Sequence, residues 1–194
     1  MLRFFGIFGG KPFTSVWSQI MTVLDEGMTF IAKTTLTGTQ AIEFTSIPTS
    51  YETLLIVITS LGSYSGTSTL DLTLRVNGDS GSNYGEITSF GATGGTASYS
   101  YGINTNHVRV GNMPGNSNSN VRALNLIYIY DYGSTTRRRQ IVGESYHAYG
   151  RAGYYCGAWN NSSSAISSIQ IQGELGTYQT TTGTYAALYG IAGY

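Results

Sequence analysis

The residue types that most often perform enzymatic chemistry are scarce in this sequence. It has two histidines, His107 and His147, and one cysteine, Cys156. A Ser-His-Asp arrangement needs a histidine held by an acid and aimed at a nucleophile, and no Gly-x-Ser-x-Gly elbow accompanies the many serines. We expect His147 to be an ordinary, half-exposed histidine at a strand end. We expect Cys156 to be a buried, inert thiol within a strand.

The carboxylates are few and scattered. A glycosidase needs two carboxylates that face each other, and the sequence pairs none of them. We therefore predict no catalytic residue, no cofactor and no enzymatic activity. The candidates within the predicted sandwich are Asp71, Asp79, Asp131, Glu86, Glu144 and Glu174.

Residues 77–83, Asn-Gly-Asp-Ser-Gly-Ser-Asn, have the oxygen-rich composition of a calcium loop. They lack the repeated acids and the terminal glutamate of an EF-hand. A simple turn is the main expectation and a weak calcium site stays open as the alternative, so no metal ligand is assigned.

The basic triplet Arg137-Arg138-Arg139 could contact nucleic acid. It opens a predicted strand after a turn, however, so its side chains would point alternately to both faces of a sheet. We expect ion pairs with acids of a neighbouring subunit, or protection of a sheet edge. Zero net charge, from 10 basic and 10 acidic residues, also argues against nucleic acid as a partner.

The composition indicates a folded β protein with covered surfaces. Hydrophobic residues make up 41% of the 194 residues and charged residues only 10%, against about 25% in an average protein. Sixteen tyrosines suit strands and interfaces. We expect either that other subunits cover much of the surface or that this is simply a Ser/Thr/Gly-rich β protein. The lone cysteine excludes an intrachain disulfide, and no apolar run is long enough to span a membrane.

The stretch at 70–76, Leu-Asp-Leu-Thr-Leu-Arg-Val, organises the rest of the chain. Its strict alternation is typical of a strand with one buried face, and Asn77-Gly78 supplies a tight turn. Period-two patterns begin at Met28 and predict an all-β fold, an antiparallel β-sandwich of jelly-roll type over 28–194. The eleven expected strands lie near 28–36, 41–44, 53–61, 70–76, 86–90, 107–110, 121–130, 138–146, 154–159, 167–174 and 184–191.

Two predicted strands, at 54–58 and 124–130, are apolar on both faces. A strand of a two-layer sandwich needs only one apolar face. Their second face should therefore be hidden by a helix, a loop or another subunit. Polar loops are expected at 91–96, 111–120 and 159–164.

Residues 1–27 differ from the rest and predict a short arm followed by an amphipathic helix, capped by Thr14 and stopped by Gly27. An isolated helix of about 13 residues is marginal in water, so its apolar stripe must dock on something. Its own sheet and a neighbouring subunit are the alternatives, and we favour the second. The expected anchoring residues are Phe4, Phe5, Phe8, Trp17 and Ile20.

Three segments carry a resemblance: AKTTLTGTQAIEFTSIP at 32–48, residues 70–84 with RVNGD at their centre, and ALYGI at 187–191. Together they resemble a widespread group of tailed-bacteriophage virion proteins, over roughly residues 28–191. The resemblance implies a surface-displayed β-sandwich, often trimeric, that serves as a head decoration, head fibre or tail fibre. It implies no functional residue.

The expected function is therefore a non-enzymatic virion protein, a trimer of β-sandwiches anchored through residues 1–27 to a capsid or tail protein. The alternative is a receptor-binding module of a tail fibre that recognises host-surface glycan. Aromatic rings would then stack on sugar faces. The expected glycan contacts are Tyr99, Tyr101, Tyr154 and Trp159.

Overall fold

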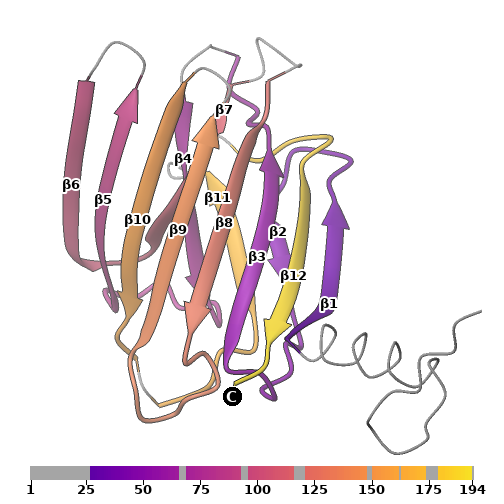
Figure 1. The fold of residues 1–194 in the computed structure, drawn as a ribbon, viewed down its shortest axis with the longest axis vertical. Helices are drawn as coiled ribbons and strands as arrows, with labels where there is room; N and C mark the ends of the chain where they lie inside the picture. The colour runs from indigo at the N-terminus through magenta and orange to yellow at the C-terminus, as the bar shows by residue number, and fades with distance from the viewer. Residues whose placement is uncertain are drawn as a thin grey trace, which may run out of the picture.

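The computed structural model describes residues 27–65, 69–92, 96–115, 121–147, 150–161, 163–173 and 179–193. Their regular structure is entirely β, in two antiparallel sheets (Figure 1). The strands are β1 (Met28–Thr35), β2 (Ile42–Phe44), β3 (Thr53–Ser60), β4 (Thr69–Val76), β5 (Tyr84–Ala92), β6 (Thr96–Thr105), β7 (Val108–Pro114), β8 (Ala123–Tyr130), β9 (Arg139–His147), β10 (Arg151–Trp159), β11 (Ile169–Gly173) and β12 (Tyr185–Ile191).

Eight strands form the large sheet, in the order β1-β12-β3-β8-β9-β10-β5-β6, and four form the small sheet, in the order β2-β11-β4-β7. Figure 1 shows the small sheet lying behind the large one. The core between them joins Ile56 and Ile127 of the large sheet to Leu72 and Leu74 of the small sheet, all fully buried. The predicted all-β sandwich is thus confirmed.

The chain crosses repeatedly between the two sheets. Without β5, β6, β9 and β10, the sheet orders are β1-β12-β3-β8 and β2-β11-β4-β7, and every link between consecutive strands changes sheet except β5 to β6, β8 to β9 and β9 to β10. This is the connectivity of a jelly roll. The hairpin β5–β6 and the pair β9–β10 are additions that widen the large sheet on one side only.

The predicted organising strand is β4, in the small sheet. Leu72, Leu74 and Val76 are buried in the core, as their alternation predicts. Asn77 and Gly78 have φ angles of 52° and 68°, and the Asp79 amide donates to the Val76 carbonyl at 2.9 Å. Two successive positive φ angles define the type I′ turn that Asn-Gly favours, and here it leads the chain from β4 in the small sheet to β5 in the large one.

The eleven predicted strands correspond to eleven of the observed ones, with shifted ends. β7 runs on to Pro114, so the expected loop at 111–120 begins later than predicted. The twelfth strand, β6, was not predicted, and it takes up part of the expected loop at 91–96. Its large side chains, Tyr99, Tyr101 and Ile103, point away from the small sheet, the reverse of the usual buried pattern.

β7 crosses the large sheet at very close range, over β8, β9 and β10. A Cβ atom on Gly143 of β9 would collide with the backbone carbonyl of Val110. One on Gly157 of β10 would lie 2.5 Å from the Val108 side chain. Glycine at these two positions therefore lets β7 approach the sheet and fixes the β9–β10 extension onto the core.

The predicted N-terminal arm and helix, with their anchoring residues Phe4, Phe5, Phe8, Trp17 and Ile20, lie outside the described residues. Within the described part of the chain, no helix is long and apolar enough to cross a membrane.

Candidate functional site

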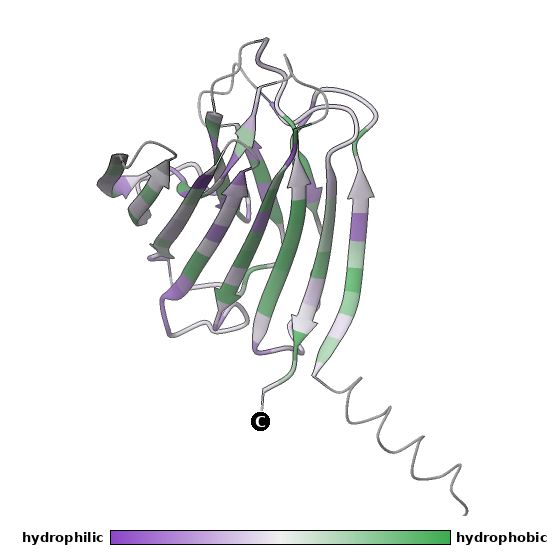
Figure 2. Cartoon of the chain, turned by 45° about the horizontal axis from the view of Figure 1, so that its top comes forward, coloured by the Kyte–Doolittle hydropathy of each residue, from purple (hydrophilic) through white to green (hydrophobic). Residues whose placement is uncertain are grey.

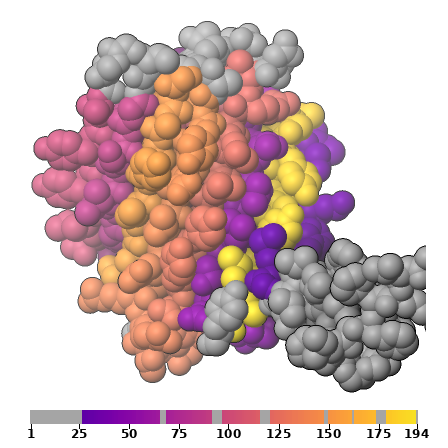
Figure 3. Space-filling view, viewed as in Figure 1, coloured from indigo at the N-terminus to yellow at the C-terminus, as the bar shows by residue number. Residues whose placement is uncertain are grey.

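The large sheet has an outer face, formed by the side chains that point away from the small sheet. Figure 3 looks directly onto it, and Figure 2 shows that the central strands are hydrophobic along much of their length. The strand register sets one apolar residue of every strand side by side, in what we name the apolar row. Its members are Phe30, Tyr189, Leu55, Tyr128, Val142, Cys156, Ile87 and Tyr101.

Charge is almost missing from this face. Among the outward positions of the described strands, only Lys33 on β1 and Glu144 on β9 are charged. Glu144 accepts a hydrogen bond of 2.9 Å from the Tyr146 hydroxyl, which is also on the outer face. The second apolar side predicted for the strands at 54–58 and 124–130 is this face, and no other described element covers it.

The outer face is most exposed where β10, β5 and β6 meet. We name this region the aromatic end. Tyr99, Tyr101 and Ile103 of β6 are 82%, 73% and 76% exposed. Tyr154 lies in the same cross-strand row as Tyr99, with only Ser89 between them. The remaining members are Ile87 and Cys156.

Three of the four expected glycan contacts, Tyr99, Tyr101 and Tyr154, are thus brought together. The fourth, Trp159, is not among them, because it points into the core and is 1% exposed. Its ring nitrogen donates to the Asp79 carboxylate at 2.7 Å, and the Arg139 guanidinium lies over its ring at 4.8 Å. Position on β10 decides this difference, because Tyr154 and Trp159 are five residues apart and face opposite ways.

A hollow of about 440 Å³ adjoins the aromatic end. Gly85 and Ala158 form part of its lining, and their small size leaves space between the larger neighbours. Ile87, Tyr101, Ile103 and Cys156 supply its apolar walls, and Asn160 adds a polar amide. The arrangement is suited to a flat ligand with one apolar face and some hydrogen-bonding groups.

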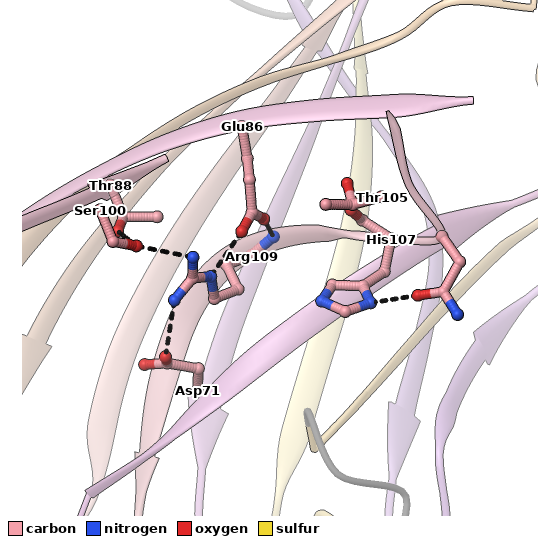
Figure 4. Close-up of polar contacts among 8 residues, drawn as sticks. Asp71, Glu86, Thr88, Ser100, Thr105, His107 and Arg109 are labelled. Carbon is pink, nitrogen blue, oxygen red and sulfur yellow. Dashed lines mark hydrogen bonds and ion pairs between the residues drawn. The ribbon is translucent and has the colours of Figure 1, made fainter. Parts of the chain in front are cut away.

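A polar network behind the aromatic end holds the β5–β6 hairpin (Figure 4). The Glu86 carboxylate, buried on the inner side of β5, accepts hydrogen bonds from the Arg109 amide at 2.5 Å and its Nε at 2.6 Å. Arg109 also donates to the Ser100 hydroxyl at 2.6 Å and lies 3.7 Å from Asp71. Arg109 belongs to β7, so the network ties the hairpin to the small sheet.

Two of the residues expected to be inert have different surroundings from those predicted. Cys156 is exposed on the outer face, not buried. His147 is 5% exposed, not half exposed, and burial followed by the nearby Arg151 charge lowers its pKa. His107 makes a 2.7 Å hydrogen bond with the Asn106 side chain, and its pKa is lowered mainly by burial. Among the described residues, no three His, Cys, Asp or Glu side chains lie together in a way that would hold a metal ion.

The oxygen-rich loop after β4 is built as a hydrogen-bonded turn. The Asp79 carboxylate accepts from the Gly81 amide at 2.8 Å, the Asn83 side chain at 2.9 Å and the Trp159 ring nitrogen. Burial raises the pKa of Asp79, but these hydrogen bonds outweigh that effect and leave the pKa below its ordinary value. Three N–H donors thus hold this carboxylate within the turn.

The basic triplet has a structural role within the chain. Arg137 forms a 3.0 Å ion pair with Asp131 of the same chain. Arg139 is fully buried, and its guanidinium donates to the backbone carbonyls of Ser134, Asn161 and Ser164. Arg139 thereby fixes the loops at one end of β9 and β10. A buried arginine at this site has no signal in the sequence beyond its place after a turn.

No protein-family model matches this chain, and no curated protein matches it in sequence. Among solved structures, it is similar to a protein of unknown function from Shewanella oneidensis MR-1. The two are 11% identical with a TM-score of 0.22, over 85% of this chain and 76% of the other.

Proposed function

We propose that this chain is a non-enzymatic structural protein of a bacteriophage virion, an oligomer displayed on the particle surface as a capsid decoration or fibre. The observation that carries the proposal is the apolar row across all eight strands of the large sheet. A contiguous apolar surface of this kind typically marks a protein interface. The resemblance over residues 28–191 supports the virion and the expectation of a trimer.

The size of the outer face agrees with a protein interface. Its strands have seven to ten residues. Eight strands about 4.8 Å apart span about 34 Å, and strands about 25 Å long then give a face of about 850 Å². A standard interface buries about 800 Å² on each partner, so the face alone is large enough for a stable association.

Residues 1–27 are proposed as the anchor on a capsid or tail protein, with Phe4, Phe5, Phe8, Trp17 and Ile20 in the contact. This separates two roles: the sandwich associates with its own copies, and the arm joins the particle. Deleting residues 1–27 should leave the sandwich folded and abolish its incorporation into particles. Incorporation at normal copy number would contradict the anchor.

Cys156 offers a direct test of the covered face, because it is the chain's only cysteine and lies in the apolar row. We expect alkylation of Cys156 in the full-length protein to slow at least tenfold as the protein concentration rises and copies associate. The unfolded protein, alkylated in denaturant, provides the maximal rate. Fast alkylation at every concentration, together with a single monomeric species, would contradict the oligomeric role.

Recognition of host-surface glycan is a second candidate function, favoured by the hollow beside Tyr101. Tyrosine rings offer flat apolar surfaces for sugars, and Asn160 supplies a hydrogen-bonding amide. Binding on a glycan array should be lost in Tyr101→Ala and kept in Tyr130→Ala, whose ring lies on the same face away from the hollow. No binding by the full-length protein would count against this function.

A further inference from the structure

β6 ends the large sheet, and no described residue pairs with its free side. Its ten residues contain no charge and no proline. The irregularity in its pairing with β5 lies near Asn104, so residues 97–103 form a regular run. Natural edge strands normally carry a charge, a proline or a bulge, because free backbone N–H and C=O groups otherwise pair with another strand.

The opposite edge of the same sheet, β1, has these protective features. Lys33 is exposed near its middle, and a bulge interrupts its pairing between Phe30 and Ala32. Both edges carry a bulge, but that of β6 lies at its end, near Asn104, and leaves 97–103 uninterrupted, whereas β1 has its bulge within the strand and also carries Lys33. The features of β1 disfavour pairing with a further strand, whereas the free edge of β6 can accept one.

β6 is also held in place before any pairing occurs. The Ser100 hydroxyl lies 3.1 Å from that of Thr88 and accepts from Arg109, as Figure 4 shows. Thr105 donates to the His107 carbonyl at 2.8 Å, where β6 turns into β7. A strand fixed in this way loses less conformational entropy when it binds a partner.

We propose that β6 pairs antiparallel with β6 of a second copy, giving one continuous sheet with eight strands from each chain. The proposal rests on the association of copies proposed above, and it names the contact. A second copy is the favoured occupant because an uncharged strand is complementary to itself in antiparallel pairing, and chains of zero net charge do not repel.

The run 97–103 pairs over its whole length when Ser100 lies on the two-fold axis. This register sets Tyr99 opposite the partner subunit's Tyr101. Aromatic pairs directly opposite each other on antiparallel strands stabilise a sheet. The hydrogen bonds supply the affinity and the tyrosine pairs set the register.

The contact has a two-fold axis, so it joins copies in pairs. Dimers would form if it acts alone. If the outer face also joins three copies, the same contact would join two trimers into a hexamer. Even-numbered species are thus the expected result in either case.

The test compares the full-length protein with Tyr101→Lys and Tyr154→Lys by native mass spectrometry over a range of concentrations. Both variants place a lysine at the aromatic end, but only Tyr101 lies on the edge strand. We expect Tyr101→Lys to lose the even-numbered species and Tyr154→Lys to keep them. Circular dichroism and melting would establish that both variants fold.

Hydrogen exchange of the unmodified protein provides a second measurement. Backbone amides of residues 97–103 should exchange at least tenfold more slowly at high protein concentration, and those of β1 should not change. Even-numbered species that survive Tyr101→Lys, or equal loss in both variants, would overturn the β6 pairing. Trimers without even-numbered species would overturn it and leave the proposed function standing, whereas monomers at every concentration would overturn both.

Discussion

The two outer faces of the sandwich are opposite in character. On the small sheet, Glu43, Gln170 and Arg75 lie side by side across β2, β11 and β4. The Gln170 amide donates to the Glu43 carboxylate at 2.9 Å, and Arg75 donates to the Asn106 carbonyl at 2.9 Å. On the large sheet, the corresponding feature is the uncharged apolar row.

Both sheets present the same kind of apolar residue to the core, so the core does not explain the contrast. On β2 and β11 of the small sheet, buried residues alternate with outward polar ones, which water can solvate. The large sheet places apolar residues on both sides of β3 and β8. The described part of the chain thus has a polar outer face on the small sheet and an apolar outer face on the large sheet, and the proposed association of copies rests on the second.

The largest expected effect is on the free energy of unfolding, and it separates substitutions at two neighbouring residues of β8 whose side chains point in opposite directions. Ile127 is fully buried in the core, and Leu126 lies on the outer face. Ile127→Ala should lower the free energy of unfolding by about 2–5 kcal/mol through the cavity it leaves. In the monomeric protein, Leu126→Ala should lower it by less than about 1 kcal/mol. Urea denaturation at low protein concentration measures both, and equal losses would remove the distinction between the core and the outer face.

An intermediate effect is expected at the network that joins the two sheets. Glu86→Gln removes the carboxylate that accepts two hydrogen bonds from Arg109, and it should cost about 1–3 kcal/mol, limited by the partial exposure of Arg109. The matched control is Glu43→Gln, on the exposed outer face of the small sheet, which should change stability by less than about 0.5 kcal/mol. Faster hydrogen exchange in β6 should accompany Glu86→Gln. A loss no larger than that of the control would contradict the structural importance of the network.

The smallest effect is expected at Tyr84, which links strand β4 of the small sheet to the β5–β6 hairpin. Its hydroxyl accepts from the Val76 amide at 3.1 Å and donates to the Asp79 carbonyl at 3.0 Å. Burial raises the pKa of Tyr84 from 10.0 to about 12. Because the folded state disfavours the ionised phenol, this contribution to stability is complete below pH 10.0 and is lost as the pH rises toward 12.

Tyr84→Phe should therefore cost about 1 kcal/mol at neutral pH, through the lost hydrogen bonds. It should also flatten the fall in stability at alkaline pH. Thermal melts of both proteins across the alkaline range measure this difference. The same alkaline slope in Tyr84→Phe would assign the fall to another group. Tyr132, whose pKa is also raised by burial, is the natural comparison.

Sequence patterns predicted the parts of the fold in which local and tertiary preferences agree. β4 alternates strictly, and its Asn-Gly turn has the conformation that those residues favour. The double-sided apolar character of β3 and β8 was also readable, and the second apolar side is the outer face of the large sheet. The sequence did not predict β6, because a strand is normally recognised by an apolar face turned inward. The alternation of serine with tyrosine at 98–101 is the one sequence signal of this strand.

The site was predictable only in part, for a related reason. Tyr99, Tyr101 and Tyr154 meet through the register of three strands, and register follows from tertiary pairing. Side chains alternate between the two faces along β10, so the position of each residue in the strand decides that Tyr154 and Cys156 are exposed and that Trp159 is buried. Glu86 contacts Arg109, and Arg139 contacts Asn161 and Ser164, each more than 20 residues away in the sequence, so residue spacing does not predict these contacts.

The close crossing of β7 over the large sheet has a consequence for how such a chain can vary. Backbone meets backbone at Gly143 and Val110, with no side chain between them to absorb a change. Exposed loops tolerate insertions, and the outer face tolerates exchanges among apolar residues. At Gly143 even a single added methyl group must push two strands apart. Among folded variants recovered from random mutagenesis, substitutions should therefore be frequent in the exposed loops and absent at Gly143.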